Sequence, residues 1–430
     1  MKSIKNEERN PWLWVPSLYL AEGLPYVFVM TVSVIMYKRL NISNAEIALY
    51  TSWLYLPWVI KPFWSPVVDL LKTKRFWIVI MQFFIGAGLA GVALTLPTEK
   101  FFQYTLAFFW LMAFSSATHD IAADGFYMLG LKQHQQAYFV GIRSTFYRIA
   151  MLAGQGLLVI LAGQIEKCSG SISYAWMITF FIMAGLFVLF LIYHLFILPY
   201  PKSDSPRAKI QVEHFVNEFL RTFISFFKKK EIIVIVLFIL LYRLAEAQLV
   251  KMTSPFLLDS KEVGGLSLST TQVGIVYGTV GVAALVIGGI LGGIVASLKG
   301  LKFWIWWMLI AINLPDLVYV YLAATQTSNF LLINICVAVE QFGYGFGFTA
   351  FMLYLIYISE GEFKTAHYAI ATGLMALGMM LPGMMSGWIQ EQVGYLNFFL
   401  WVCISTIPAF IITKFVNIDP SFGIKNETVS

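Results

Sequence analysis

The segment 174–198 reads YAWMITFFIMAGLFVLFLIYHLFIL and contains no Asp, Glu, Lys or Arg. A helix of about 20 apolar residues crosses the hydrocarbon core of a bilayer, which is about 30 Å thick. The segment is therefore long enough to span a membrane as one helix. Its apolar residues are continuous rather than alternating with polar ones, which argues against a strand of a transmembrane barrel.

Comparable apolar segments recur along the whole chain. The 430 residues are 59% hydrophobic and 12% charged, whereas a soluble domain has about 25% charged residues. We therefore predict an all-α membrane protein of about twelve transmembrane helices. The predicted spans are residues 12–37, 46–71, 76–97, 101–130, 138–164, 174–198, 232–258, 270–297, 303–324, 330–359, 366–391 and 395–417.

The basic residues between these spans predict the orientation of the chain. If the N-terminus is cytoplasmic, the inside segments carry nineteen Lys and Arg, and the outside segments carry five. Cytoplasmic loops are enriched in Lys and Arg, so both termini are expected on the cytoplasmic side of the membrane. The net charge of +6 then reflects membrane topology, and we predict no nucleic-acid partner.

The sequence gives no sign of a catalytic or cofactor site. Cys168, Cys336 and Cys403 lack metal-ligand spacing, and no disulfide framework is implied. The glycine-rich run 288–293 lies inside an apolar span, so it cannot be a phosphate-binding loop. We predict a monomer that is not an enzyme and that binds no cofactor or metal.

Three collinear internal matches divide the chain into two similar halves. They pair LAEG at 20–23 with LAEA at 244–247, LKTKRFW at 71–77 with LKGLKFW at 298–304, and residues 137–154 with 366–383. The offsets of 224, 227 and 229 residues are nearly constant, and each match falls on the corresponding span of the other half. A parallel duplication of six helices is the architecture of the major facilitator superfamily, which the chain therefore resembles.

The duplication predicts three regions. Residues 1–199 form an N-terminal six-helix bundle, 200–231 a cytoplasmic linker, and 232–430 a C-terminal six-helix bundle. Apolar residues at helical spacing after position 212 predict an amphipathic helix in the linker, and a poorly ordered linker is the alternative. Asp69, Lys72 and Arg75 resemble the superfamily's loop between its second and third helices, which implies a role in gating or in stability.

Several segments also resemble the AmpG-like muropeptide permeases, within a wider group that includes acetyl-CoA carriers. These segments are EGLPY at 22–26, PWVIKPFWSPVVD at 57–69, SATHDIAADGFY at 116–127, PFLLD at 255–259 and SGW at 386–388. The resemblance implies a symporter for cell-wall recycling that imports anhydromuropeptides with protons. A carrier of the same fold for another anionic solute, such as acetyl-CoA, a sugar acid, a siderophore or a drug, is the alternative.

Carboxylates inside the spans are candidates for proton coupling, because a coupling group must bind and release a proton as the site alternates between water and a drier environment. We favour Glu22 and Asp124, followed by Asp120 and Glu246. Asp316 and Glu340 are also eligible by position. His119 is a further candidate for proton relay, although a lone intramembrane His more often satisfies a local hydrogen bond.

The fourth and fifth spans are expected to form a hairpin around a turn near His134. Residues equally distant from that turn then lie at equal depth, which pairs Asp124 with Arg143 and Asp120 with Arg148. The alternative is that these ion pairs only hold the two helices together.

Basic and aromatic residues inside the spans are candidates for substrate binding. Lys61, Arg143 and Arg243 would attract carboxylates, and Arg offers a bidentate fork. Trp58, Tyr127 and Tyr147 are aromatic candidates for contact with sugar rings, although most aromatic side chains in such a chain serve packing.

Overall fold

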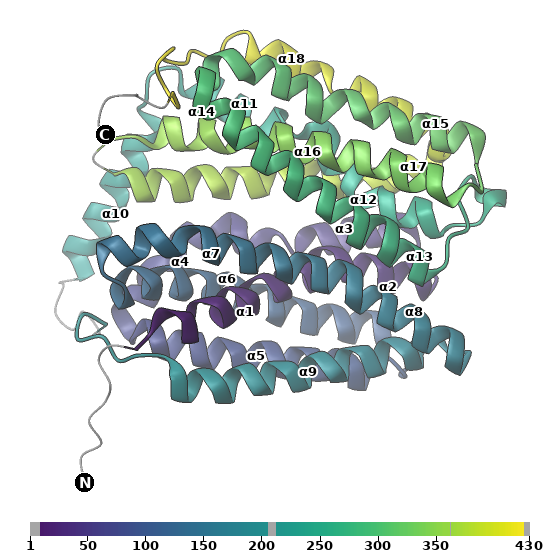
Figure 1. Cartoon of the computed structure of the whole chain (residues 1–430), viewed down its shortest axis with the longest axis horizontal. Coiled ribbons are helices and arrows are strands. Elements are labelled where there is room, and N and C mark those ends of the chain that lie inside the picture. The colour runs from purple at the N-terminus through teal and green to yellow at the C-terminus, as the bar shows by residue number, and fades with distance from the viewer. Residues whose placement is uncertain (1–8, 205–211, 362, 425–430) are drawn as a thin grey trace. The chain divides into compact units, whose positions relative to one another are not determined.

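The computed structural model describes residues 9–204, 212–361 and 363–424. All regular elements in these ranges are helical, which confirms the predicted all-α fold. Every predicted span has a helical counterpart (Figure 1). Within the described residues, eight continuous helical segments are long and apolar enough to cross a membrane.

The first half is built from helices that match the first six predicted spans. After a 3-10 turn η1 (Pro11–Leu13) they are α1 (Val15–Val27), η2 (Phe28–Val32), α2 (Ser33–Arg39), α3 (Asn44–Trp53), α4 (Leu56–Leu71), α5 (Lys74–Thr95), α6 (Phe101–Gly130), α7 (Gln133–Leu152), η3 (Ala153–Leu157), α8 (Leu158–Ser169) and α9 (Ile172–Ile197). Helices α5 and α9 pack side by side (Figure 1).

The second half follows the helix α10 (Val212–Phe227), which is present where the sequence predicts an amphipathic linker helix. Its elements are α11 (Ile232–Leu241), α12 (Leu244–Leu258), η4 (Lys261–Val263), α13 (Thr270–Val273), η5 (Gly274–Gly281), α14 (Val282–Asn313), η6 (Leu314–Asp316), α15 (Leu317–Thr325), α16 (Phe330–Ser359), α17 (Lys364–Ile404) and α18 (Ile407–Thr413).

Two glycines divide the longest helices, α14 and α17, each of which contains parts of two predicted spans. Gly300 interrupts α14 with φ 76° and ψ 165°, and Gly394 interrupts α17 with φ 76° and ψ 167°. A positive φ is inexpensive only for glycine. The chain therefore turns between consecutive spans at these two points, where the sequence predicts boundaries.

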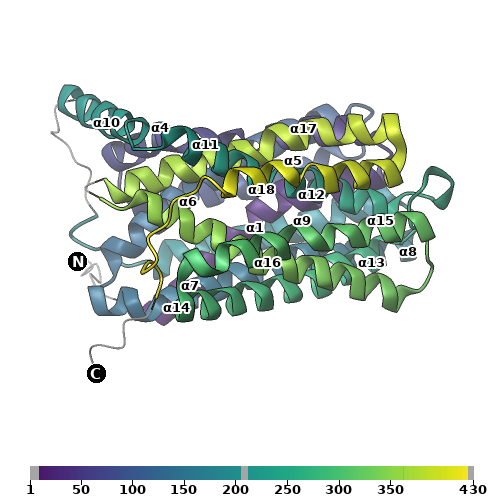
Figure 2. The same ribbon diagram turned by 90° about the horizontal axis from the view of Figure 1, so that it is seen from above.

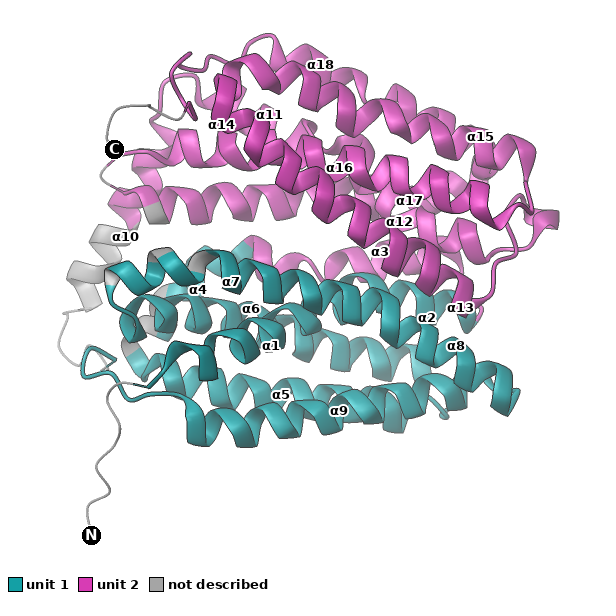
Figure 3. Cartoon of the chain, viewed as in Figure 1, with its two compact units in different colours: residues 1–40, 60–211 teal, residues 41–59, 212–430 magenta. Residues whose placement is uncertain are grey.

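The helices pack into two compact units (Figure 3). Unit 1 contains residues 1–40 and 60–211, and unit 2 contains residues 41–59 and 212–430. The segment 41–59 thus groups with the second half rather than with the predicted N-terminal bundle. The cause is the packing of α3 on α17, where the Ala45 amide donates to Glu391 Oε1 at 2.8 Å and Asn44 Nδ2 donates to Gln390 Oε1 at 2.5 Å.

Each unit has its own apolar core. Trp14, Tyr19 and Phe126 are buried in unit 1, and Phe238 and Phe351 are buried in unit 2. Within unit 2, α14 and α16 run side by side (Figure 2). Glycines on both helices allow their backbones to approach closely, as is common between membrane helices.

Gly345 on α16 provides a direct test of this close approach. A Cβ atom at Gly345 would collide with the carbonyl oxygen of Leu285 and lie 3.0 Å from the amide nitrogen of Gly289. We expect Gly345→Ala to destabilise the protein by about 1–3 kcal/mol, because backbone atoms must move to admit the methyl group. Thermal unfolding in detergent measures this.

Gly293→Ala on α14 is the matched control, since a Cβ atom there meets nothing within 4 Å. The two variants add the same methyl group to a helix. Equal melting temperatures for both would contradict the close helix approach.

Candidate functional site

Unit 1 gathers five charged side chains from four helices. Glu22 comes from α1, Lys61 from α4, Asp120 and Asp124 from α6, and Arg143 from α7. Glu22, Asp120 and Asp124 each place one carboxylate oxygen so that the three atoms lie within 4.8 Å of one another. One cluster therefore contains the three carboxylates of the first half that were predicted to couple protons. It also contains two residues that were predicted to bind substrate, Lys61 and Arg143.

Two ion pairs organise this cluster. Arg143 Nη1 lies 3.0 Å from Asp124 Oδ1, which is the pair that the hairpin argument predicts. Asp120 instead accepts from Lys61 Nζ, which differs from the predicted partner, Arg148. The cation that pairs with Asp120 comes from α4, a helix outside the hairpin of the fourth and fifth spans.

Tyr19 completes the arrangement around Asp124. Its hydroxyl donates to Asp124 Oδ1 at 3.1 Å and accepts from Arg143 Nη1 at 3.0 Å. The Arg143 guanidinium also lies over the rings of Tyr19 and Tyr127, 4.8 and 5.1 Å from their centroids. We did not predict Tyr19, although its position one helical turn before Glu22 places both on one face of α1.

Glu22 is the most enclosed carboxylate of the cluster, with 7% of the residue exposed. The next residue, Gly23, allows α1 to approach α7, because a Cβ atom there would lie 2.8 Å from Ala150 Cβ and 3.1 Å from the Tyr147 carbonyl oxygen. Tyr147, a predicted substrate residue, is within electrostatic range of Glu22. Glu22 Oε2 is buried without a hydrogen-bond partner among the described residues.

The cluster contains more acidic than basic groups. Three carboxylates face two cations, so one negative charge remains when every group is ionised. Removing an unpaired carboxylate from water is costly unless it is neutralised. Three carboxylate oxygens at this separation also offer ligands for a cation, but Lys61 and Arg143 already occupy two of the carboxylates. The arrangement therefore suits one bound proton.

A buried polar chain lies beside this cluster. Gln82 on α5 hydrogen-bonds to His119 Nε2 at 3.1 Å and to His194 Nδ1 at 2.8 Å. His194 Nε2 is 3.0 Å from Ser17 Oγ. His119 thus satisfies a local hydrogen bond to Gln82, and the whole chain of side chains connects α5, α6, α9 and α1. His119 also adjoins Asp120 in sequence.

In unit 2, the predicted residues Arg243 and Glu246 lie at the break between α11 and α12. The Arg243 side chain donates to the Tyr344 hydroxyl, and its guanidinium lies 4.7 Å from the ring centroid of Phe348. No ion pair of Arg243 occurs within the part of the chain that the structure describes. Glu246 is buried, with 2% exposed, and both of its oxygens lack a described hydrogen-bond partner.

The other predicted residues, and the hydroxyl of Tyr127, make separate contacts. Trp58 is half-buried on α4, one turn before Lys61, and the Tyr127 hydroxyl donates to the Gln136 carbonyl. Of the predicted gating group, the Asp69 side chain lies outside the described residues. Lys72 is exposed and lies 5.8 Å from the Phe76 ring centroid. Arg75 donates to the Leu195 carbonyl, which fastens the start of α5 to the end of α9.

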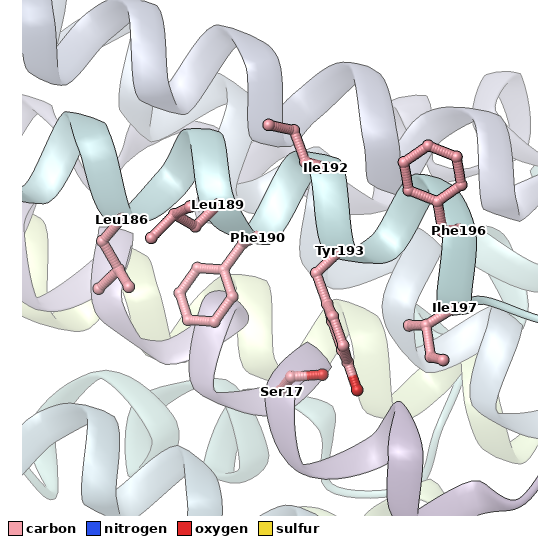
Figure 4. Close-up of a pocket in the computed structure, with 8 residues that line it drawn as sticks. All are labelled: Ser17, Leu186, Leu189, Phe190, Ile192, Tyr193, Phe196 and Ile197. Atoms are coloured by element: carbon pink, nitrogen blue, oxygen red, sulfur yellow. The ribbon is translucent and has the colours of Figure 1, made fainter.

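An apolar groove of about 610 Å³ lies elsewhere in unit 1 (Figure 4). It is lined by Ser17 and by residues of α9, including Phe190, Tyr193 and Phe196. The lining contains no charged side chain and none of the predicted site residues. The groove therefore does not suit an anionic solute, and the charged cluster remains the candidate site.

Comparisons with known proteins agree with this architecture. The profile of the Major Facilitator Superfamily matches residues 18–387. "Putative transporter AmpG 4" of Rickettsia conorii is 24% identical over 93% of this chain and 95% of its own length. "Anhydromuropeptide permease" of Escherichia coli K12 is 26% identical over 83% of this chain and 69% of its own length.

A solved structure shares the fold. The inward open form of the xylose transporter XylE from E. coli has a TM-score of 0.68 with 14% identity, and the match covers 94% of this chain and 96% of that one. At this identity the likeness concerns the arrangement of helices alone.

Proposed function

Because the chain belongs to the major facilitator superfamily, as its motifs and internal duplication predicted, we propose that it is a proton-coupled importer of anhydromuropeptides that works by alternating access. The chain is a multi-pass membrane transporter rather than an enzyme. We further propose that it lies in the bacterial inner membrane with both termini in the cytoplasm. Its role there would be to recover cell-wall fragments.

The charge imbalance of the unit 1 cluster carries the proposal of proton coupling. One proton on Glu22, Asp120 or Asp124 would bring the five groups to zero net charge. Glu22 is the best position, because Asp120 and Asp124 are already paired with Lys61 and Arg143. A proton taken up from the periplasm and released to the cytoplasm would then drive import.

The exposure of the Arg143–Asp124 pair supports a role in binding an anionic cargo. The Arg143 side chain is 31% exposed and that of Asp124 is 41% exposed, so the protein does not fully enclose either group. A cargo carboxylate that took the place of Asp124 on Arg143 would leave Asp124 without its cation and favour transfer of the Glu22 proton to Asp124. Binding of cargo and proton would thereby be linked at one residue pair.

The cargo assignment rests on chemistry and on similarity. Muramyl peptides carry carboxylates that suit Lys61, Arg143 and Arg243, and sugar rings that suit the aromatic residues Trp58, Tyr127 and Tyr147. The similar E. coli protein is named an anhydromuropeptide permease. Other anionic solutes are competing cargoes that a transport assay must include. They are acetyl-CoA, a sugar acid, a siderophore and an anionic drug.

Uptake of labelled anhydromuropeptide into proteoliposomes with an imposed pH gradient tests the proposal. We expect the gradient to accelerate uptake by the wild type at least tenfold. Glu22→Gln should remove this acceleration, since Gln cannot carry the proton, while exchange of cargo without a gradient should persist. Asp124→Asn should weaken both, because it also frees Arg143.

Glu99→Gln is the matched control, because Glu99 is an exposed carboxylate in the connection between α5 and α6. Its uptake should equal that of the wild type. Gradient-independent uptake by the wild type would refute proton coupling. Uptake of a competing anion, but not of the muropeptide, would support the carrier function and refute the proposed cargo.

A further inference from the structure

Unit 2 contains a second set of buried carboxylates. Glu246 on α12, Asp316 at the end of η6 and Glu340 on α16 are 2%, 1% and 1% exposed. The three side chains lie within electrostatic range of one another. They come from three separate elements of one unit, so their proximity is a product of the fold.

Two of these carboxylates lack a hydrogen-bond donor within the part of the chain that the structure describes. Both oxygens of Glu246 and both oxygens of Asp316 are buried without a partner among the described residues. An isolated ionised carboxylate in such surroundings is strongly unfavourable, whereas a protonated carboxyl group has no net charge to desolvate. Four unpartnered oxygens therefore point to a bound proton or another bound cation.

Glu340 differs from the other two. Its Oε2 accepts from the Tyr319 hydroxyl at 3.1 Å, and Gln341 Nε2 lies 3.2 and 3.1 Å from its two oxygens. An ionised carboxylate is an acceptor only, and these donors suit that form. Glu340 is thus the member of the set that can remain charged.

The basic groups around the three carboxylates do not neutralise their negative charge. Arg243 is the basic residue in range, and its guanidinium is directed to Tyr344 and Phe348. Lys251, also on α12, donates to Thr51 Oγ1 at 2.9 Å and shows no interaction with the set. Among the described residues, the other titratable groups in range of the set are the phenols of Tyr277 and Tyr319 and the Cys403 thiol.

A close helix contact holds the set together. Gly343 lies one turn after Glu340 on α16, and a Cβ atom there would collide with the Ala311 carbonyl and lie 2.9 Å from Pro315 Cγ. The missing side chain allows α16 to rest against η6. Glu340 is thereby brought beside Asp316.

We propose that unit 2 carries its own proton-binding site, in which Asp316 and Glu246 hold a proton beside the ionised Glu340. This proposal rests on the proposed function. It adds a stoichiometry of two protons per cargo molecule, one bound in the cluster of each unit. Asp316 and Glu246 offer carboxyl groups of equal chemistry on different elements, and neither has a hydrogen-bond partner among the described residues, so either can carry the proton.

Infrared spectroscopy of the purified chain in lipid nanodiscs tests the site without any cargo. Protonated carboxyl groups absorb separately from carboxylates. We expect two such signals in the wild type during titration from acid to alkaline pH. Asp316→Asn should remove or shift one, and Glu246→Gln should affect the same signal. Glu22→Gln should affect only the other.

The control Glu262→Gln changes an exposed carboxylate of unit 2 and should leave both signals intact. If Asp316→Asn does not fold, Glu246→Gln supplies the same test from α12. Spectra of both variants that superimpose on that of the wild type would overturn the proposal. Replacement of the unit 2 signal by added Na⁺ would also overturn it, in favour of a metal-cation site.

A second measurement connects the site to transport. The proton-to-cargo ratio, obtained from the membrane potential that stops net uptake, should fall from two in the wild type to one in Asp316→Asn. An absence of muropeptide uptake would defeat the proposed function while leaving the infrared result valid. A ratio of one in the wild type would contradict the second coupled proton.

Discussion

Replacing Lys61 by Met should abolish uptake and lower the free energy of unfolding by about 3–5 kcal/mol. The substitution removes the cation that faces Asp120 and leaves three carboxylates against the single guanidinium of Arg143. Met fills a volume similar to that of Lys, so the loss concerns charge rather than packing. Chemical or thermal unfolding in detergent and proteoliposome uptake measure the two effects.

A double substitution separates stability from transport. Lys61→Met with Asp120→Asn removes both members of the ion pair and should recover most of the lost stability, because no carboxylate loses its cation and the net charge of the cluster equals that of the wild type. Uptake should remain absent if the pair belongs to the coupling machinery. Recovery of uptake together with stability would instead make it a structural pair.

The matched control for this series is Lys100→Met, which removes an exposed ammonium from the same unit. It should change neither the melting temperature nor uptake. A double variant that is no more stable than Lys61→Met would contradict the charge argument itself.

The membrane fold could be predicted because its signals are local. A helix such as α9 is long and apolar enough to identify from its own residues, and the breaks at Gly300 and Gly394 fall where polar or glycine residues separate two apolar runs. The duplication added the order of the helices. None of these steps required knowledge of which helices touch.

Packing partners were harder to predict because they depend on contacts between distant segments. The grouping of α3 with α17 depends on side chains more than 340 positions away, such as Gln390 opposite Asn44. The Lys61–Asp120 pair joins α4 to α6 across 59 positions. A rule based on neighbouring spans finds Arg143 for Asp124 and has no information about α4.

The site was predicted in its residue types rather than in its geometry. Charged residues inside apolar spans were enough to select Glu22, Asp124, Arg143 and Glu246. Tyr19 escaped selection because a tyrosine in an aromatic-rich chain carries no signal until its hydroxyl is seen between Asp124 and Arg143.

Replacing Arg243 by Ala should weaken binding of an anionic cargo by roughly 10- to 150-fold, which corresponds to about 1.5–3 kcal/mol for a hydrogen bond to a charged group. Arg243 is held by a hydroxyl and an aromatic ring rather than by a described carboxylate partner. Its guanidinium group can therefore donate to a carboxylate of the cargo without first breaking an ion pair. The dissociation constant of labelled anhydromuropeptide for the purified protein measures the effect.

The comparison that isolates the charge uses a cargo analogue whose peptide carboxylates are converted to amides. Wild type and Arg243→Ala should bind this neutral analogue within about twofold of each other, since the guanidinium then has no anion to contact. Arg243→Lys should fall between the two for the acid, because it keeps the charge and loses the planar fork. Arg221→Ala removes an exposed guanidinium of the same unit and should bind both cargoes as the wild type does. An equal loss of affinity for acid and amide would mean that Arg243 shapes the site through Tyr344 and Phe348, and its assignment as a carboxylate-binding residue would be withdrawn.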